Sequence, residues 1–186
     1  MSNSNLNSIE NTILSSLRDV PDFPKKGIIF KDITPILSNP IIFDQTLTAL
    51  AELLKPLNLT HIAGIEARGF IFGAPLAREL KLPFVPIRKP GKLPWKKQSI
   101  SYTLEYGSAT IEIHEDALGD NPENSRVAMI DDLLATGGTT KAACQLIKAI
   151  GGKVVVAAFI VELGFLNGKN VLIDEVSEIK SLASVK

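Results

Sequence analysis

The chain of 186 residues has a length typical of one domain with a sizeable core, and its 20 basic side chains balance 20 acidic ones. This balance argues against a general attraction to nucleic acid or to an anionic membrane surface. One cysteine excludes an internal disulfide, and the longest apolar run, at 154–161, is too short to span a bilayer. Because the N-terminus also lacks the features of a signal peptide, a cytoplasmic protein is expected.

The spacing of apolar residues predicts helices and strands along the chain. A helix is expected over 8–20, and a second over 40–54, capped by Ser38 or Asn39 with proline in its first turn. Further elements follow in this order: a strand at 62–65, a helix at 70–80, a strand at 84–87, a β-hairpin of 101–106 and 110–114, a strand from 127, a helix at 141–150 and a strand at 154–161. Apolar strands that alternate with helices predict an α/β fold with an open, mainly parallel sheet flanked by helices.

Residues 127–140, VAMIDDLLATGGTT, form the most specific pattern in the chain. An apolar strand ends in Asp131 and Asp132, and a loop of small and hydroxylated residues leads into a helix. Free N–H groups at a helix start suit a phosphate, and the two acids suit the hydroxyls of a ribose or a cation beside them. A plain tight turn is the alternative, but the complete pattern favours a site for a ribose 5-phosphate.

Basic residues follow the other two early strands. Arg68 and Gly69 come after the first, and Arg88, Lys89 and Lys92 come after the second. Since ligands of open α/β sheets bind at the carboxyl ends of the strands, these cations are expected at the same edge as the acids. The planar guanidinium of Arg68 suits paired phosphate oxygens, so a pyrophosphate is expected there. A solvated basic loop is the alternative interpretation.

Two segments are candidates for covering the ligand. The long stretch 88–101 and the hairpin after it resemble a lid that excludes water, and Glu105 on the hairpin could exchange a proton with a nucleobase. Near the N-terminus, Ile29 to Lys31 offer a strand edge for hydrogen bonds, with Phe30 as a platform for a flat ring. The alternatives are a surface glutamate and an ordinary edge strand.

The motifs FPKKGIIFKDITP, IEARGFIFGAPLA, IRKPGKLP, YTLEYG and IDDLLATGGTT occur in this order over nearly the whole chain. The set resembles the type I phosphoribosyltransferase family, and the first and fourth motifs are typical of its adenine-specific members. The resemblance implies a purine salvage enzyme that transfers the phosphoribosyl group of Mg²⁺-bound phosphoribosyl pyrophosphate to N9 of adenine, giving AMP and pyrophosphate. It also implies a homodimer in which part of the basic loop reaches the neighbouring site.

The resemblance further assigns roles to individual positions. Glu105 and Arg68 would be catalytic, and Mg²⁺ would be held mainly through the substrate and water rather than by protein ligands. Residues 135–139 would hold the 5-phosphate, the acid pair the ribose hydroxyls, and the basic residues the pyrophosphate, while adenine would lie between Phe30 and Leu133. The substrate-binding residues would be Ile29, Phe30, Lys31, Arg68, Arg88, Lys89, Lys92, Tyr106, Asp131, Asp132, Leu133, Ala135, Thr136, Gly137, Gly138 and Thr139.

The expected organisation is a single domain over 1–186. It would have an N-terminal helix and base-binding hood over about 1–35, a flexible loop and hairpin lid over 88–114, and a tail over 170–186. No motif follows Gly168, and 177–186 are expected to be loosely ordered. Ala67 stands where many relatives have serine, which removes one hydroxyl from the pyrophosphate loop.

Two other functions were weighed against this one. A transferase for xanthine or guanine would need contacts to a 6-oxo group, and the FKDITP and LEYG elements argue against it. A regulator that binds phosphoribosyl pyrophosphate without catalysis would need a DNA-binding module, and the segment before Phe23 is too short for a winged helix.

Overall fold

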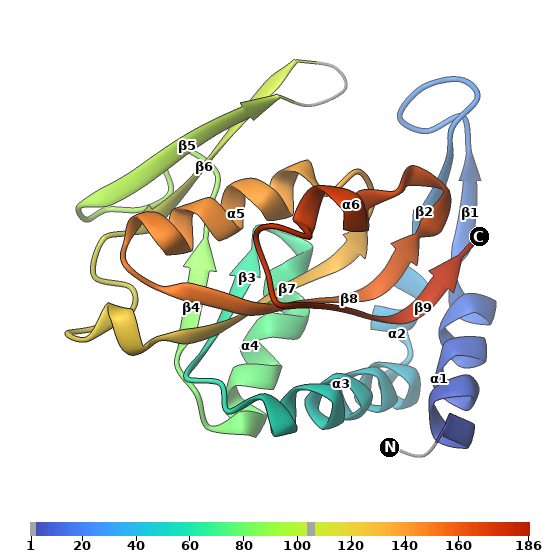
Figure 1. Ribbon diagram of the computed structural model, residues 1–186. Coiled ribbons are helices and arrows are strands. Elements are labelled where there is room, and N and C mark those ends of the chain that lie inside the picture. The colour runs from blue at the N-terminus through green and yellow to red at the C-terminus, as the bar shows by residue number, and fades with distance from the viewer. Residues whose placement is uncertain (1–2, 104–106) are drawn as a thin grey trace.

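A five-stranded parallel sheet forms the centre of the computed structural model, which describes residues 3–103 and 107–186 (Figure 1). Its strand order is β4-β3-β7-β8-β9, and every neighbouring pair is parallel. The strands are His61–Ile65 (β3), Phe84–Ile87 (β4), Arg126–Leu134 (β7), Lys153–Leu163 (β8) and Glu178–Val185 (β9). The chain runs outward from β3 to β4 and then returns to the other side of β3, so the order reverses between β3 and β7. Such a reversal is the usual ligand site of an open α/β sheet.

Helices cover both faces of this sheet (Figure 1). Leu50 and Phe72 belong to the buried core on one face, and Cys144 and Ile147 belong to the core on the other. Helices of the first face are Asn3–Ser16 (α1), Thr34–Ser38 (α2), Pro40–Leu54 (α3) and Arg68–Leu80 (α4), and those of the second are Gly138–Ala149 (α5) and Gly168–Leu172 (α6). Short 3₁₀ turns occupy Lys55–Leu57, Pro122–Asn124 and Gly164–Leu166. The predicted fold class is confirmed.

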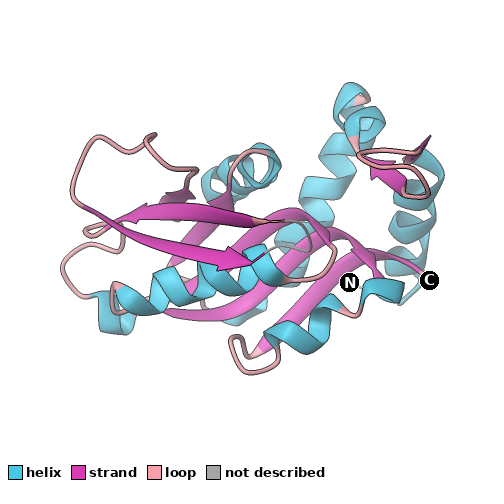
Figure 2. Ribbon diagram, turned by 90° about the horizontal axis from the view of Figure 1, so that it is seen from above, coloured by secondary structure: helices cyan, strands magenta, loops and turns pink. Residues whose placement is uncertain are grey.

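Two antiparallel strand pairs project from the same side of the molecule (Figure 1). The first, here called the hood, pairs Arg18–Pro21 (β1) with Ile29–Asp32 (β2). The second, the hairpin, pairs Lys97–Thr103 (β5) with Ser108–His114 (β6) and lies across α5 (Figure 2). The hairpin begins four residues earlier than the sequence indicated at Ser101, because the register continues from Tyr102↔Ala109 back to Lys97↔His114.

The predicted helix over 40–54 is confirmed, and the structure decides its cap. The Asn39 side-chain oxygen accepts hydrogen bonds from the N–H groups of Ile41 and Ile42, at 3.1 and 3.2 Å. Cys144 is a buried core residue, as expected, and burial raises the pKa of its thiol to about 12. In the described part of the chain, no helix has the length and apolar character needed to cross a membrane.

The first predicted helix is wrong at its C-terminal end. α1 stops at Ser16, and Arg18–Pro21 is a strand whose partner, β2, lies in the segment expected to form the hood. Ion pairs join the two strands, with Arg18 Nε 3.3 Å from Asp32 Oδ2 and Lys31 Nζ 2.6 Å from Asp19 Oδ1. Apolar spacing within one segment carries no information on such a distant partner.

The expectation of a loosely ordered end is also wrong. Glu178–Val185 forms the edge strand β9, which pairs with β8 from Val156↔Glu178 to Leu163↔Val185. Leu182 and Ala183 are buried, and α1 packs against the strand. The strand is ordered because it covers the otherwise open edge of the long apolar strand β8, which is a property of the sheet rather than of the segment itself.

Candidate active site

A cavity of about 370 Å³ lies between the hood, the start of α4, the end of β7 and the start of α5. It combines main-chain donors, carboxylates, a guanidinium and an aromatic ring. The predicted residues that line it are Ile29, Phe30, Lys31, Arg68, Asp131, Asp132, Leu133, Ala135, Thr136, Gly137, Gly138 and Thr139. Three separate sequence motifs therefore meet at one place.

The loop before α5 has the geometry of an anion site. Gly137 has a left-handed backbone, with φ of 83°, and precedes the helix without a capping side chain. The helix hydrogen bonding starts with the Lys141 N–H, which donates to the Gly137 oxygen at 2.9 Å. The N–H groups of Gly138 to Thr140 thus have no acceptor within the helix, and they lie beside the cavity.

The acid pair lies within β7 rather than after it, which corrects the expectation that the strand would end before Asp131. Asp132 is buried, and its Oδ2 is 2.7 Å from Arg68 Nε. Asp131 Oδ1 accepts a hydrogen bond of 3.0 Å from the Asp132 N–H. Burial and the neighbouring charge of Asp132 raise the pKa of Asp131 well above its ordinary value. Burial also raises the pKa of Asp132, although Arg68 opposes the shift.

Arg68 connects this acid pair to the hood. Besides its bond to Asp132, its guanidinium carbon lies 5.4 Å from the centroid of the Phe30 ring. The edge of the Phe23 ring supports Phe30, with the two centroids 5.2 Å apart. The Arg68 guanidinium therefore contacts both the Phe30 ring and the Asp132 carboxylate, and its side chain remains 42% exposed.

Gly69 is needed for packing within the protein. A Cβ atom there would lie 2.6 Å from the Ile130 carbonyl oxygen and 3.1 Å from Asp131 Oδ1. Its missing side chain lets the start of α4 approach β7 at the acid pair. A side chain here would displace the backbone that carries Asp131.

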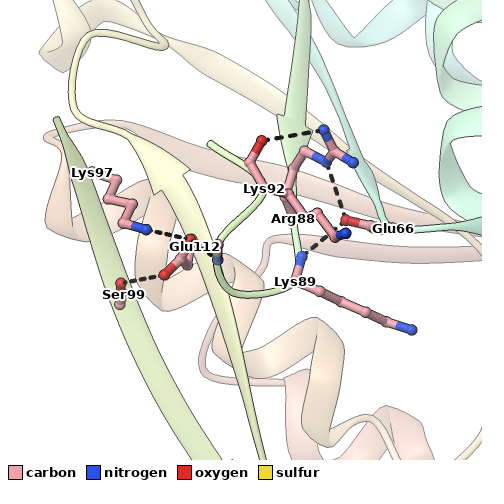
Figure 3. A network of polar contacts seen from close by, with 8 residues as sticks. Glu66, Arg88, Lys89, Lys92, Lys97, Ser99 and Glu112 are labelled. Carbon is pink, nitrogen blue, oxygen red and sulfur yellow. Dashed lines mark hydrogen bonds and ion pairs between the residues drawn. The ribbon is translucent and has the colours of Figure 1, made fainter. Parts of the chain in front are cut away.

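Arg88, Lys89 and Lys92 lie outside the cavity lining, and Figure 3 shows the contacts that hold this part of the chain. Arg88 Nε is 3.1 Å from Glu66 Oε2, and the Lys89 N–H donates to the same oxygen at 3.0 Å. These contacts lower the pKa of Glu66, the bond from Lys89 contributing most. Glu66 thus fixes the path of the basic loop and engages the Arg88 side chain, while Lys89 and Lys92 are exposed. Their contact with a pyrophosphate stays a prediction.

Glu112 is a second anchor of the basic loop that the sequence analysis missed. This buried residue of β6 accepts hydrogen bonds from the Gly91 N–H at 3.0 Å, Lys97 Nζ at 2.8 Å and Ser99 Oγ at 3.3 Å (Figure 3). It therefore joins the loop to the hairpin. No signal in the sequence distinguishes it from an exposed glutamate, because its partners lie on two other segments, the basic loop and β5.

Gly168, after which the sequence has no further motif, packs directly against the loop that precedes α5. A Cβ atom on Gly168 would collide with the Ala135 carbonyl oxygen, and one on Gly137 would lie 2.6 Å from the Gly168 oxygen. The start of α6 therefore packs directly on the loop that faces the cavity. In the sequence, the Asn-Gly pair at 167–168 indicates a turn at this point.

Glu105 and Tyr106 lie outside the described residues, so their predicted roles cannot be compared with a position in the structure. The pairing of Thr103 with Ser108 brackets them. Their strand is tied to the cavity at Tyr102, whose hydroxyl donates to Thr139 Oγ1 at 3.1 Å. Tyr102 was not among the predicted site residues.

The family model of the phosphoribosyl transferase domain matches residues 33–175. With the fold and the cavity described above, this match defines the protein as a phosphoribosyltransferase. The chain is 54% identical over 162 residues to the adenine phosphoribosyltransferase of Sulfurovum sp. (84% of this chain, 87% of the relative) and 51% identical over 169 residues to that of Thermobifida fusca (91% and 93%). It belongs to the adenine phosphoribosyltransferase family.

Solved structures agree with this assignment. The adenine phosphoribosyltransferase of Thermoanaerobacter pseudethanolicus has 48% identity and a TM-score of 0.88, covering 94% of this chain and 99% of that one. The enzyme of Saccharomyces cerevisiae, solved with an iminoalditol bisphosphate and adenine, has 36% identity and a TM-score of 0.86, covering 95% and 99%. The family that the motifs indicated is confirmed.

Proposed function

We propose that the cavity at the end of β7 is where this chain carries out the reaction of its family. In that reaction adenine N9 displaces pyrophosphate from C1 of phosphoribosyl pyrophosphate, and AMP is formed in purine salvage. The observation that carries the proposal is that one cavity is lined by residues 135–139, here called the phosphate loop, together with two carboxylates, Arg68 and the Phe30 ring. These groups match the 5-phosphate, the ribose hydroxyls, the pyrophosphate and the base.

The sharpest test supplies the pure protein with phosphoribosyl pyrophosphate, Mg²⁺ and one purine base at a time. Adenine is expected to give AMP, and guanine, xanthine and hypoxanthine are expected to give no nucleotide above the background. Faster conversion of a 6-oxopurine than of adenine would overturn the proposed specificity.

The sugar phosphate would bind along β7 and the start of α5. Main-chain donors from Ala135 to Thr139 would hold the 5-phosphate, and Asp131 and Asp132 would accept hydrogen bonds from the ribose hydroxyls. The Asp132 bond to Arg68 supports this order of groups, because with the ribose on Asp132 the guanidinium would lie beside the carbon from which pyrophosphate leaves. Fixing the sugar in this way removes much of the entropic cost of the displacement.

Adenine would lie against Phe30, with Leu133 on its other face. Both side chains line the cavity. Over the described residues, β2 has only β1 as a strand partner, which supports main-chain recognition of the base by Ile29 and Lys31 along the other edge. An apolar slot with a few backbone donors and acceptors suits a flat base.

Charge neutralisation would supply much of the barrier reduction. The sugar passes through an oxocarbenium-like state, as in glycoside cleavage, but pyrophosphate is already a good leaving group. Among described residues, the acids lining the cavity are Asp131 and Asp132, one of them paired with Arg68. This set is smaller than a protein-built Mg²⁺ site and supports an ion bound mainly through the substrate and water, where it would neutralise pyrophosphate charge.

A homodimer is also proposed, in the cytoplasm. Lys89 and Lys92 are exposed and outside the cavity, and Trp95 on the same loop is 62% exposed. These features suit a loop that contacts a second copy of the chain and contributes residues to the site of that copy. Sedimentation velocity is expected to give twice the mass of the chain, and a monomer that retains full activity would contradict the proposal.

Glu105→Gln is expected to slow the chemical step by about 10² to 10⁴, the usual effect of losing a general acid or base. Adenine N9 must shed its ring proton, and an amide cannot accept it. Single-turnover measurements isolate this step, and adenine affinity should change far less. Glu115→Gln, an exposed glutamate at the far end of the hairpin, serves as the control. A wild-type single-turnover rate for Glu105→Gln would reduce Glu105 to a part of the lid.

Gly168→Ala is expected to raise the KM for phosphoribosyl pyrophosphate by about tenfold, because the added methyl group must push the Ala135 backbone out of the phosphate loop. Gly152→Ala is the matched control, since a Cβ there would collide with Leu118, away from the cavity. Both variants should unfold at lower temperature, but only Gly168→Ala should change the KM. Equal KM values in the two variants would show that the packing of Gly168 against Ala135 affects only stability.

A further inference from the structure

The hairpin and the phosphate loop are joined by one hydroxyl pair at the cavity. Tyr102 in β5 donates a hydrogen bond of 3.1 Å to Thr139 Oγ1, and Thr139 is the second residue of α5. The hairpin backbone is also near, since a Cβ on Gly138 would lie 3.8 Å from the Thr103 oxygen. Figure 2 shows the hairpin lying over this helix. The contact therefore links the proposed lid to the residue that faces the 5-phosphate.

The direction of this hydrogen bond matters for the chemistry of Thr139. A hydroxyl carries one proton and two lone pairs, and the Tyr102 bond occupies a lone pair. Thr12 and Thr46 donate their protons to the carbonyl four residues earlier in their helices. Within the described chain, Thr139 Oγ1 donates to no protein group, so its proton remains available to the cavity that it lines.

We propose that Tyr102 is a positioning residue that presents the Thr139 hydroxyl as a donor to the 5-phosphate. The inference rests on the proposed function, in which residues 135–139 hold that phosphate. A phosphate oxygen that accepts from Thr139 polarises its hydroxyl and strengthens the bond from Tyr102 in turn. Binding of the phosphate thereby also holds the end of β5, three residues before Glu105.

A packing role is the competing explanation for Tyr102. Its ring is partly buried and lies with Ile100 against the core beneath the hairpin. Phenylalanine would satisfy this packing equally well, so Tyr102→Phe removes only the hydroxyl. Ser101→Ala is a matched control, because Ser101 forms a hydroxyl pair of 2.9 Å with Thr110 on the same hairpin without touching the phosphate loop.

The test compares AMP with adenosine, which has the same base and sugar but no phosphate, by calorimetric titration. Tyr102→Phe is expected to weaken AMP binding by about threefold to tenfold, which corresponds to the loss of one hydrogen bond. Its affinity for adenosine should stay within about twofold of the wild-type value. Ser101→Ala should change neither. Thr139→Val should weaken AMP binding, and adding Tyr102→Phe to it should cause no further loss of affinity. Thr139→Ser should keep the wild-type affinity for AMP, and Tyr102→Phe should still reduce that affinity in the Ser variant.

Three outcomes would overturn the inference. Unchanged AMP affinity in Tyr102→Phe, with wild-type protein still preferring AMP to adenosine, would remove the role of Tyr102 and leave the phosphate site intact. Losses that multiply in the Tyr102→Phe, Thr139→Val double variant would show that Tyr102 does not act through Thr139. A wild-type protein that binds adenosine as tightly as AMP would refute the phosphate assignment, and the inference with it.

Discussion

Changing both Asp131 and Asp132 to asparagine is expected to weaken phosphoribosyl pyrophosphate binding by about 100-fold or more while leaving the protein folded. Carboxylates accept hydrogen bonds from the ribose hydroxyls more strongly than amides do, and each charged bond contributes about 1.5–3 kcal/mol. Calorimetric titration measures the loss. The exposed pair Asp116→Asn and Asp120→Asn changes net charge equally and is the control. Unchanged affinity in the first double variant would refute the ribose assignment.

The same double variant is expected to unfold at a higher temperature than the wild type near neutral pH. Burial raises the pKa of both acids in the folded protein, and the charge of Asp132 adds to the shift at Asp131. The folded state therefore binds more protons than the unfolded one above the ordinary pKa of 3.8. The contribution of these two acids to stability is therefore most favourable below that value and is lost as pH rises through their raised pKa values. The unfolding temperature of the variant should lack the part of the fall with rising pH that the two acids cause. An equally steep pH dependence in the variant and the wild type would contradict this prediction.

Arg68→Ala is expected to weaken the binding of phosphoribosyl pyrophosphate by about 100-fold and the binding of AMP by less than about tenfold. The guanidinium fork suits the pyrophosphate, which AMP lacks. AMP binding should fall somewhat, because Arg68 lies 2.7 Å from Asp132 and opposes the rise that burial causes in the pKa of that carboxyl. Titrations with both ligands measure the difference.

Two variants sharpen the Arg68 experiment. Arg68→Lys keeps the charge but not the fork, so it should recover part of the pyrophosphate affinity. Arg78→Ala makes the same substitution at the exposed far end of α4 and should change neither affinity. Equal losses of both ligands in Arg68→Ala would place Arg68 at the sugar or the base instead.

The sequence determined the fold class and most of the residues that line the cavity. Uninterrupted apolar runs at 127–130 and 154–161 are typical of strands covered on both faces, and the structure confirms such strands in β7 and β8. The glycine-rich loop before α5 was equally readable, because a left-handed glycine and a helix start are local features. Local geometry depends on neighbouring residues in the chain, so the sequence displays it directly.

Only the tertiary structure decided which groups meet. The pairing of Arg68 with Asp132 joins residues 64 positions apart, and the contacts of Glu112 join three segments. The same holds for β9, which is ordered by the open edge of β8, and for Gly69, whose missing side chain makes room for Ile130. Each of these contacts depends on the packing of distant elements, so the pattern of residues around each position did not reveal its partner.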